Sequence, residues 1–327
     1  MNNKIKKKVL RLETNIKDRF LRRFKKENTI KTYEVGIRKF YNYIIEKKNY
    51  DTEEEILLNT TVDDMEDYVI YLEVQKQFKM NTINKDIEVL KEFFEYVVKR
   101  HMIQFNPTDT LTKFSKNEVE AEKKEKETLT LEELKKLIDT INAKKITSEE
   151  KEFLRARDVL VVFLLATSGC RAEELFKMKW SWLEETNLGY VINIPEEFVK
   201  NKIAKRVPIV KSIERYFKYY KAFLVSMGKN NPDDYFFISR NGNRYTAVQS
   251  CRNLEKYTKK AGIEKNITNH SFRHGLTQYL VKKEVQESMI YKIMGWKEQG
   301  IQAQYSGKSA DPQFDKIKFE VCDILKG

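Results

Sequence analysis

Apolar residues recur at helical spacing through most of the first hundred positions. Six of them fall on one stripe over residues 29–44: Ile30, Tyr33, Ile37, Phe40, Tyr41 and Ile44. A second stripe runs through residues 81–99: Ile83, Ile87, Leu90, Phe94 and Val97. We interpret the aromatic residues as core rather than as base-stacking groups, and Lys85, Lys91 and Lys99 as free to contact phosphates. The pattern predicts an all-helical domain over residues 10–105.

Two breaks divide the chain after this helical region. Asn106-Pro107 ends it, because the residue before a proline is pushed out of helical geometry. Residues 113–127 are nearly all charged or small, which is typical of a solvated linker, with a short helix as the alternative. Thr130-Leu-Glu-Glu133 has the form of a capping box and begins the next domain. The predicted organisation is a helical N-terminal domain (1–106), a charged linker (107–127), a second domain (128–310) and a C-terminal helical tail (311–327).

The second domain contains a predicted joint between two helices. The apolar run Val159–Ala166 is typical of a buried helix, and Thr167-Ser-Gly169 interrupts it. Arg171 then lies at the start of a new helix, where backbone N–H groups and the helix dipole favour an anion. Glu174, three residues later, can orient the guanidinium. The simpler alternative is a helical joint that carries a surface arginine.

A short hairpin is predicted between residues 190 and 210. Tyr190–Ile194 alternates like a strand, Lys200–Lys205 is a basic turn, and Arg206–Val210 returns. A lysine at the tip of such a hairpin can reach a DNA groove. The predicted fold class is therefore mainly α, with a small antiparallel β-sheet in the second domain.

The segment from Asn269 to Tyr305 holds the chemically richest residues. His270 and Arg273 are three residues apart and share one face of a helix, so they can hold one anion. Arginine suits phosphate because its planar fork donates two parallel hydrogen bonds and stays charged. Tyr305 supplies a hydroxyl able to attack such a phosphate. A partly buried His270 without any role in catalysis is the alternative that this pair alone leaves open.

Charge favours a polyanionic partner. The chain has 62 Lys and Arg against 49 Asp and Glu, a formal net charge of +13. Residues 1–50 hold 16 basic against 5 acidic residues, whereas residues 51–75 hold none against 9. Such segregation is expected of a surface that faces DNA phosphates on one side.

Other classes of protein are disfavoured by what the sequence lacks. Its three widely spaced cysteines indicate a reducing cytoplasm. No apolar run approaches a membrane span, and no apolar signal core follows the basic N-terminus. There is no phosphate-binding glycine loop and no paired-cysteine motif, so we expect neither ATP use nor a structural metal.

Five elements follow one another in a distinctive order: Gly169-Cys-Arg171-Ala-Glu-Glu174-Leu175, Lys200 eight residues before Pro208, His270-Ser-Phe-Arg273, Met294-Gly-Trp296, and Tyr305 nine residues later. Together they resemble the tyrosine recombinase (phage integrase) family over roughly residues 128–310. One departure concerns Trp296, where most members place a histidine, although tryptophan is also known there. An indole keeps an N–H donor but cannot accept a proton, so we expect no proton transfer at this position.

The resemblance implies transesterification without metal or cofactor. Tyr305 would attack the scissile phosphodiester and form a 3′-phosphotyrosine. Arg171 and Arg273 would neutralise the non-bridging oxygens as charge develops, with Glu174 supporting Arg171. Because the phosphotyrosine keeps the bond energy, a second DNA hydroxyl can reseal the strand without ATP.

The resemblance also assigns roles to the remaining site residues. Lys200 would be the general acid for the departing 5′ oxygen, with Lys202 and Lys205 in the same turn as reserve candidates. His270 would accept the proton of the nucleophile or bind the phosphate. Trp296 would position the phosphate and pack the site.

The family's assembly gives the expected partners. Its two domains clamp duplex DNA from opposite sides. The short N-terminal extension favours a simple recombinase with short inverted-repeat core sites, acting as a dimer on each site and a tetramer on two. The tail over residues 311–327 would dock on a neighbouring subunit or, equally, fold back on its own domain.

The leading interpretation is a cytoplasmic site-specific DNA recombinase of the integrase, transposase or resolvase type, as found on mobile genetic elements. One alternative is an enzyme that breaks and rejoins a single duplex, such as a type IB topoisomerase or a hairpin telomere resolvase. Another is a non-catalytic DNA-binding relative. The sequence specifies neither the DNA site nor which of these recombination roles the protein serves.

Overall fold

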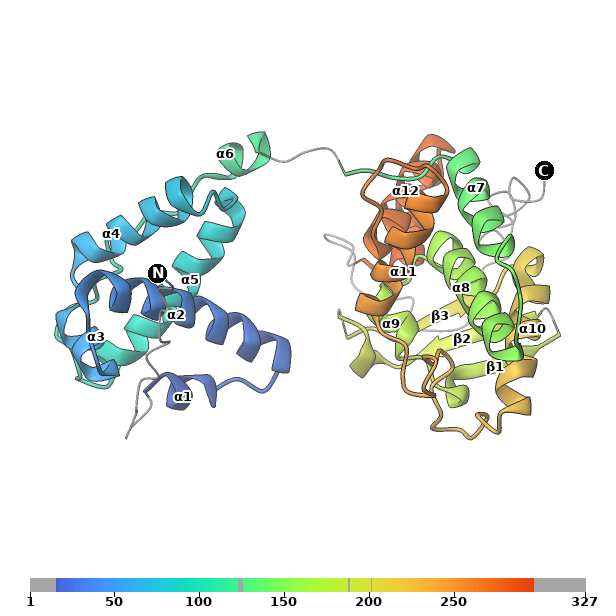
Figure 1. The fold of residues 1–327 in the computed structure, drawn as a ribbon, viewed down its shortest axis with the longest axis horizontal. Helices are drawn as coiled ribbons and strands as arrows, with labels where there is room; N and C mark the ends of the chain where they lie inside the picture. Colours follow the sequence, from blue (N-terminus) through green and yellow to red (C-terminus); the bar gives the residue numbers. More distant parts are fainter. Residues whose placement is uncertain (1–15, 123–125, 188, 201, 297–327) are drawn as a thin grey trace, which may run out of the picture. The chain divides into compact units, whose positions relative to one another are not determined.

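The computed structural model describes residues 16–122, 126–187, 189–200 and 202–296. The chain divides into two compact units, residues 1–124 and 125–327 (Figure 1). The described residues are mostly helical, with one three-stranded antiparallel sheet in the second unit. The predicted fold class, mainly α with a small antiparallel sheet, is confirmed.

The described part of the first unit is helical. Its elements are α1 (Ile16–Leu21), α2 (Glu27–Lys48), α3 (Glu53–Asn59), α4 (Val62–Ile70), a π-helical turn (Tyr71–Gln75), α5 (Met80–Lys99) and α6 (Lys116–Ala121). Helices α2 and α5 pack against each other through the two predicted stripes, and Phe40 and Phe94 are fully buried between them. The aromatic residues of the stripes are thus core, as predicted.

The segment that follows Pro107 is fastened to α5. The side-chain amide of Asn84 pairs with both backbone groups of Phe114, at 2.9 and 2.8 Å. Glu122 accepts a hydrogen bond from the backbone of Met80 at 2.8 Å. Ser115 caps α6, so the short helix, the alternative to a solvated linker, forms over residues 116–121. The predicted domain boundaries at residues 106 and 128 stay predictions.

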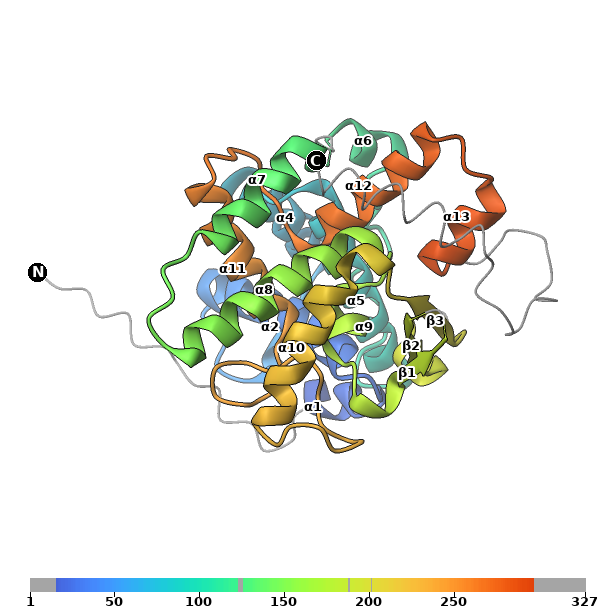
Figure 2. The ribbon, with the colours of Figure 1, turned by 90° about the vertical axis from the view of Figure 1, so that its right-hand side faces the viewer.

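The second unit surrounds the long apolar helix α8. Its elements are α7 (Leu131–Asn142), α8 (Glu149–Thr167), α9 (Ala172–Phe176), three short 3₁₀ turns (Trp180–Trp182, Glu196–Phe198 and Lys211–Ile213), β1 (Leu183–Thr186), β2 (Gly189–Ile194), β3 (Lys205–Pro208), α10 (Glu214–Ser226), α11 (Ala247–Lys260), α12 (Asn269–Lys282) and α13 (Glu287–Met294). Figure 2 shows α8 between α7 and α10, and α8 also contacts α12. The predicted capping box begins α7, since Thr130 and Glu133 bond to each other's backbone.

The sheet has the order β1-β2-β3, with both pairs antiparallel. The predicted hairpin is confirmed as β2 and β3. Strand β1, with the sequence Leu-Glu-Glu-Thr, carried no alternating apolar signal and was not expected. Strand β3 begins one residue earlier than predicted, because Lys205 pairs with Ile194 in the ladder. Lys205 therefore belongs to a strand rather than to the turn.

The joint between α8 and α9 has the predicted break. Gly169 adopts a φ of 61°, and a Cβ atom there would lie 2.9 Å from the carbonyl oxygen of Ile293. Only glycine satisfies both constraints without strain. Arg171 then occupies the N-cap position of α9. The joint thus places Gly169 against the C-terminal end of α13, two residues before Arg171.

Candidate active site

Arg273 connects three segments of the second unit. Its side chain is buried on α12, and its guanidinium donates one hydrogen bond to the carbonyl of Gly169 and another to that of Met294. These carbonyls belong to the joint before α9 and to the end of α13. Burial, followed by the nearby charge of Arg171, lowers the pKa of Arg273. The two guanidinium groups are therefore close enough for their charges to oppose each other.

Arg171 is held from one side by Glu174. The carboxylate accepts a hydrogen bond from Nη1 of Arg171 at 2.8 Å and another from its backbone N–H at 3.0 Å. The side chain of Glu174 is 3% exposed, whereas that of Arg171 is 28% exposed. The buried carboxylate thus orients the guanidinium and leaves part of it open to an anion.

His270 lies near the start of α12, one turn before His274. The two rings meet edge to face with centroids 4.5 Å apart, and His274 Nε2 lies 2.9 Å from Nζ of Lys126. The pKa of His270 is lowered by burial, and then by the positive charges of Lys126, Arg273 and Arg171. A neutral imidazole is thereby favoured, which can accept a proton. Lys126 was not found from the sequence, because it approaches α12 from 148 positions away.

Trp296 follows α13 and lies beside Arg273. The guanidinium carbon of Arg273 is 5.7 Å from the centroid of its ring, within range of a cation–π contact. The ring also lies 5.7 Å from that of Tyr291, whose hydroxyl bonds to Glu287. Trp296 thus packs against the site, which suits its expected role.

The three candidate lysines differ in their surroundings. Lys200 and Lys202 are exposed in the segment between β2 and β3. Lys205 is buried, with Nζ 3.1 Å from the carbonyl oxygen of Gly169 and 3.8 Å from Sγ of Cys170. In this structure it is the reserve candidate Lys205, and not Lys200, that lies with the arginines. Tyr305 and the tail over residues 311–327 lie outside the described residues, so their roles stay predictions.

The described residues hold no group of three or more metal-ligating side chains. No helix in the same part of the chain is long and apolar enough to span a bilayer.

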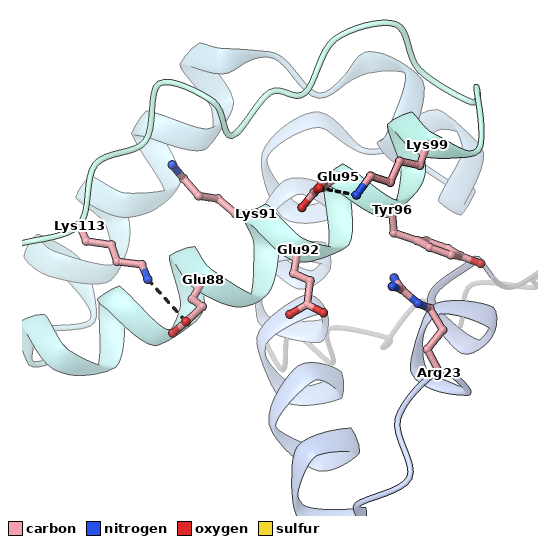
Figure 3. A pocket seen from close by; sticks show the side chains of 8 residues that line it. All are labelled: Arg23, Glu88, Lys91, Glu92, Glu95, Tyr96, Lys99 and Lys113. Carbon is pink, nitrogen blue, oxygen red and sulfur yellow. Dashed lines mark hydrogen bonds and ion pairs between the residues drawn. The ribbon is translucent and has the colours of Figure 1, made fainter. Parts of the chain in front are cut away.

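A separate charged surface lies in the first unit, along α5 (Figure 3). It surrounds a depression of about 470 Å³, where Lys113 lies 3.6 Å from Glu88 and Arg23 lies over the ring of Tyr96. Lys99, expected to be free for phosphates, instead pairs with Glu95. This pair is exposed and spaced i,i+4, so it is weak and can yield to a phosphate. The remaining lining residues are Lys91 and Glu92.

Comparison with known proteins identifies the family of this chain. A family model described as "Phage integrase family" matches residues 127–311, which is more than half of the sequence and includes Arg171, His270 and Arg273. The chain belongs to the phage integrase family. It is a tyrosine recombinase, an enzyme of site-specific DNA recombination.

Curated relatives resemble this recombinase over most of their length. "Tyrosine recombinase XerC" of Herpetosiphon aurantiacus is 24% identical over 272 residues, covering 82% of this chain and 80% of the relative. "Tyrosine recombinase" of Thermosipho africanus is 24% identical over 298 residues, covering 89% and 93%. These matches favour neither a topoisomerase nor a non-catalytic relative.

Solved structures share the fold. XerH site-specific recombinase bound to palindromic difH substrate has a TM-score of 0.63 at 18% identity, covering 89% of this chain and 76% of that chain. A lambda integrase(75-356) dimer bound to a COC′ core site has a TM-score of 0.62 at 15% identity, covering 90% and 98%. At this identity the likeness concerns the fold.

Proposed function

We propose that this recombinase cleaves duplex DNA by attack of the Tyr305 hydroxyl on the scissile phosphodiester. The new bond joins the tyrosine oxygen to the 3′ phosphate, and the broken bond releases a 5′ hydroxyl. A 5′ hydroxyl of a second duplex then attacks the phosphotyrosine and frees Tyr305. Each step exchanges one phosphate ester for another, so the cycle needs no ATP. Arg171 and Arg273 supply the positive charge that neutralises the phosphate oxygens.

The observation that carries this proposal is the pair formed by Arg171 and Arg273. Both guanidinium groups are held by hydrogen bonds to other groups of the protein, and their like charges oppose each other. An anion between them relieves that repulsion. Because charge on the phosphate oxygens grows toward the transition state, prearranged donors of this kind accelerate the reaction rather than only binding DNA.

The other residues complete the reaction. Neutral His270 accepts the proton of the attacking tyrosine, while Trp296 packs against Arg273 and holds the phosphate in place. Lys200 donates a proton to the departing 5′ oxygen. Glu174 keeps Arg171 oriented.

The partner is duplex DNA with short inverted-repeat core sites, one dimer binding each site and a tetramer joining two. The net charge of +13 and the basic side chains on both units suit a clamp around DNA. The solved relatives include a lambda integrase tetramer bound to a Holliday junction. They also include a Tn1549 transposon integrase in complex with circular intermediate DNA, which is consistent with a recombinase encoded by a mobile element.

A nicked suicide substrate tests the chemistry. Wild-type protein mixed with such DNA is expected to form an adduct that survives boiling in detergent, and Tyr305→Phe is expected to bind the same DNA without forming it. Tyr291→Phe is the matched control, since Tyr291 is the nearest alternative nucleophile. An adduct that persists in Tyr305→Phe and disappears in Tyr291→Phe contradicts the proposal.

A further inference from the structure

Lys205 occupies a position where a strand normally places an apolar residue. Along β3, Lys205 and Val207 are buried, while Arg206 between them is exposed and pairs with Glu184 at 3.0 Å. Successive side chains of a strand point to opposite faces, so Lys205 is on the core side of the sheet. A buried lysine is costly unless its ammonium is engaged.

The side chain of Lys205 runs to the joint before α9. A Cβ atom on Gly295 would lie 3.7 Å from its Cδ and 3.8 Å from its Cε, so the stem passes close to the turn that follows α13. Its ammonium then donates to the carbonyl of Gly169 at 3.1 Å. Lys205 thereby connects the sheet with the two segments that Arg273 also holds.

The carbonyl of Gly169 accepts hydrogen bonds from two cations, Lys205 and Arg273. Burial lowers the pKa of Lys205, and Arg273 and Arg171 lower it further, whereas Cys170 and Glu174 oppose this. The repulsion among Lys205, Arg273 and Arg171 destabilises the folded protein, so stability does not account for their proximity. The arrangement is understandable if it serves an anion that binds between the arginines.

We propose that Lys205 is a positioning residue of this recombinase. It holds the joint from Gly169 to Arg171 through the Gly169 carbonyl, and through the same carbonyl it fixes the orientation of Arg273. The inference rests on the proposed function of the two arginines. It gives Lys205 a task that differs from the general acid role of Lys200.

The two tasks respond differently to one change in the DNA. A bridging 5′ sulfur leaves as a thiolate and needs no proton donor, so it restores activity when a general acid is missing. The charge on the non-bridging oxygens remains. Loss of a residue that positions the arginines therefore slows cleavage of the sulfur substrate as well.

The experiment uses the full-length protein and three substitutions at position 205. Lys205→Met keeps the length of the stem without the ammonium, Lys205→Gln keeps a donor without the charge, and Lys205→Arg keeps both. The neighbouring Arg206→Met, on the exposed face of β3, is the matched control. Single-turnover cleavage is measured at saturating and limiting DNA with ordinary and 5′-thio substrates, and binding is measured separately.

We expect Lys205→Met to lower the cleavage rate at saturating DNA about 10²-fold on both substrates, because a small misplacement of catalytic groups has that effect. DNA binding and the rate of Arg206→Met are expected to stay near wild type. Lys205→Gln and Lys205→Arg are expected to recover part of the lost rate on both substrates.

Several outcomes overturn the inference. Selective recovery of Lys205→Met on the sulfur substrate makes Lys205 the general acid. A wild-type rate in Lys205→Met leaves it without a role in the site. If Lys205→Met does not fold, Lys205→Gln replaces it in the test. A Lys205→Gln variant that folds and cleaves at the wild-type rate also leaves Lys205 without a role in the site. In each case the wild-type adduct still forms and is lost in Tyr305→Phe, whereas failure of the proposed function means that no adduct forms or that it persists in Tyr305→Phe.

Discussion

The buried carboxylate of Glu174 accepts hydrogen bonds from both the backbone and the guanidinium of Arg171, at 3.0 and 2.8 Å. One side chain thus caps α9 and orients the arginine at its N-cap. The two hydrogen bonds thus restrict the rotamers of Arg171 and hold its positive charge in one position.

We expect Glu174→Ala to slow cleavage by about 10²-fold, since Arg171 loses its orientation while keeping its charge. Single-turnover cleavage and DNA binding measure this, and binding is expected to change little. Glu173→Ala is the matched control, because Glu173 is the exposed neighbour on the same helix. Equal loss of binding and cleavage in Glu174→Ala would contradict a role in orientation.

Replacing Arg171 or Arg273 by alanine distinguishes the effect of their charge on cleavage from their effect on the stability of the fold. Arg171→Ala and Arg273→Ala are both expected to lower the cleavage rate by orders of magnitude with a modest loss of binding, because these cations act mainly on the transition state.

Arg273→Ala is expected in addition to reduce stability by about 1–3 kcal/mol, because the carbonyl of Met294 loses its charged donor, whereas that of Gly169 keeps Lys205. Arg171 is partly exposed, so its loss costs less. Urea denaturation of the two variants measures the difference. Equal unfolding free energies would show that the bonds to Gly169 and Met294 carry little of the stability.

Lys200 is expected to behave as a proton donor. Lys200→Ala cleaves ordinary DNA slowly and recovers on a substrate with a bridging 5′ sulfur, because a thiolate leaves unaided. Lys202→Ala, on the same exposed segment, is the control and is expected to resemble wild type on both substrates. Recovery of Lys202→Ala instead of Lys200→Ala would move the general acid along the turn.

The rate of cleavage at limiting DNA is expected to fall as the pH drops through the pKa of His270, which lies below the usual 6.5. The sign follows from the role of the neutral ring, since protonation removes the acceptor. In Lys126→Gln one positive neighbour is lost, so the pKa rises and the acid limb moves to higher pH.

Lys126→Arg keeps the charge and is expected to keep the wild-type profile. Cleavage that becomes faster as the pH falls would assign His270 the other role, that of a cation that binds the phosphate.

Patterns in the sequence were sufficient to predict many of the helices and strands of this protein and its family. Apolar periodicity predicted α2 and α5, and a broken apolar run predicted the joint at Gly169. Alternation predicted the hairpin, and the spaced motifs named the family. The structural signals depend on neighbours within a few positions, and the family motifs depend on their order along the chain, so the sequence alone determined them.

Only the tertiary structure decided which groups meet. Arg273 reaches the carbonyl of Gly169 across 104 positions, and Lys126 reaches His274 across 148. The basic turn offered three lysines with no local difference in chemistry, yet the register of β3 buries Lys205 and leaves Lys200 exposed. Such contacts arise from the packing of distant segments, which no periodicity along the chain records.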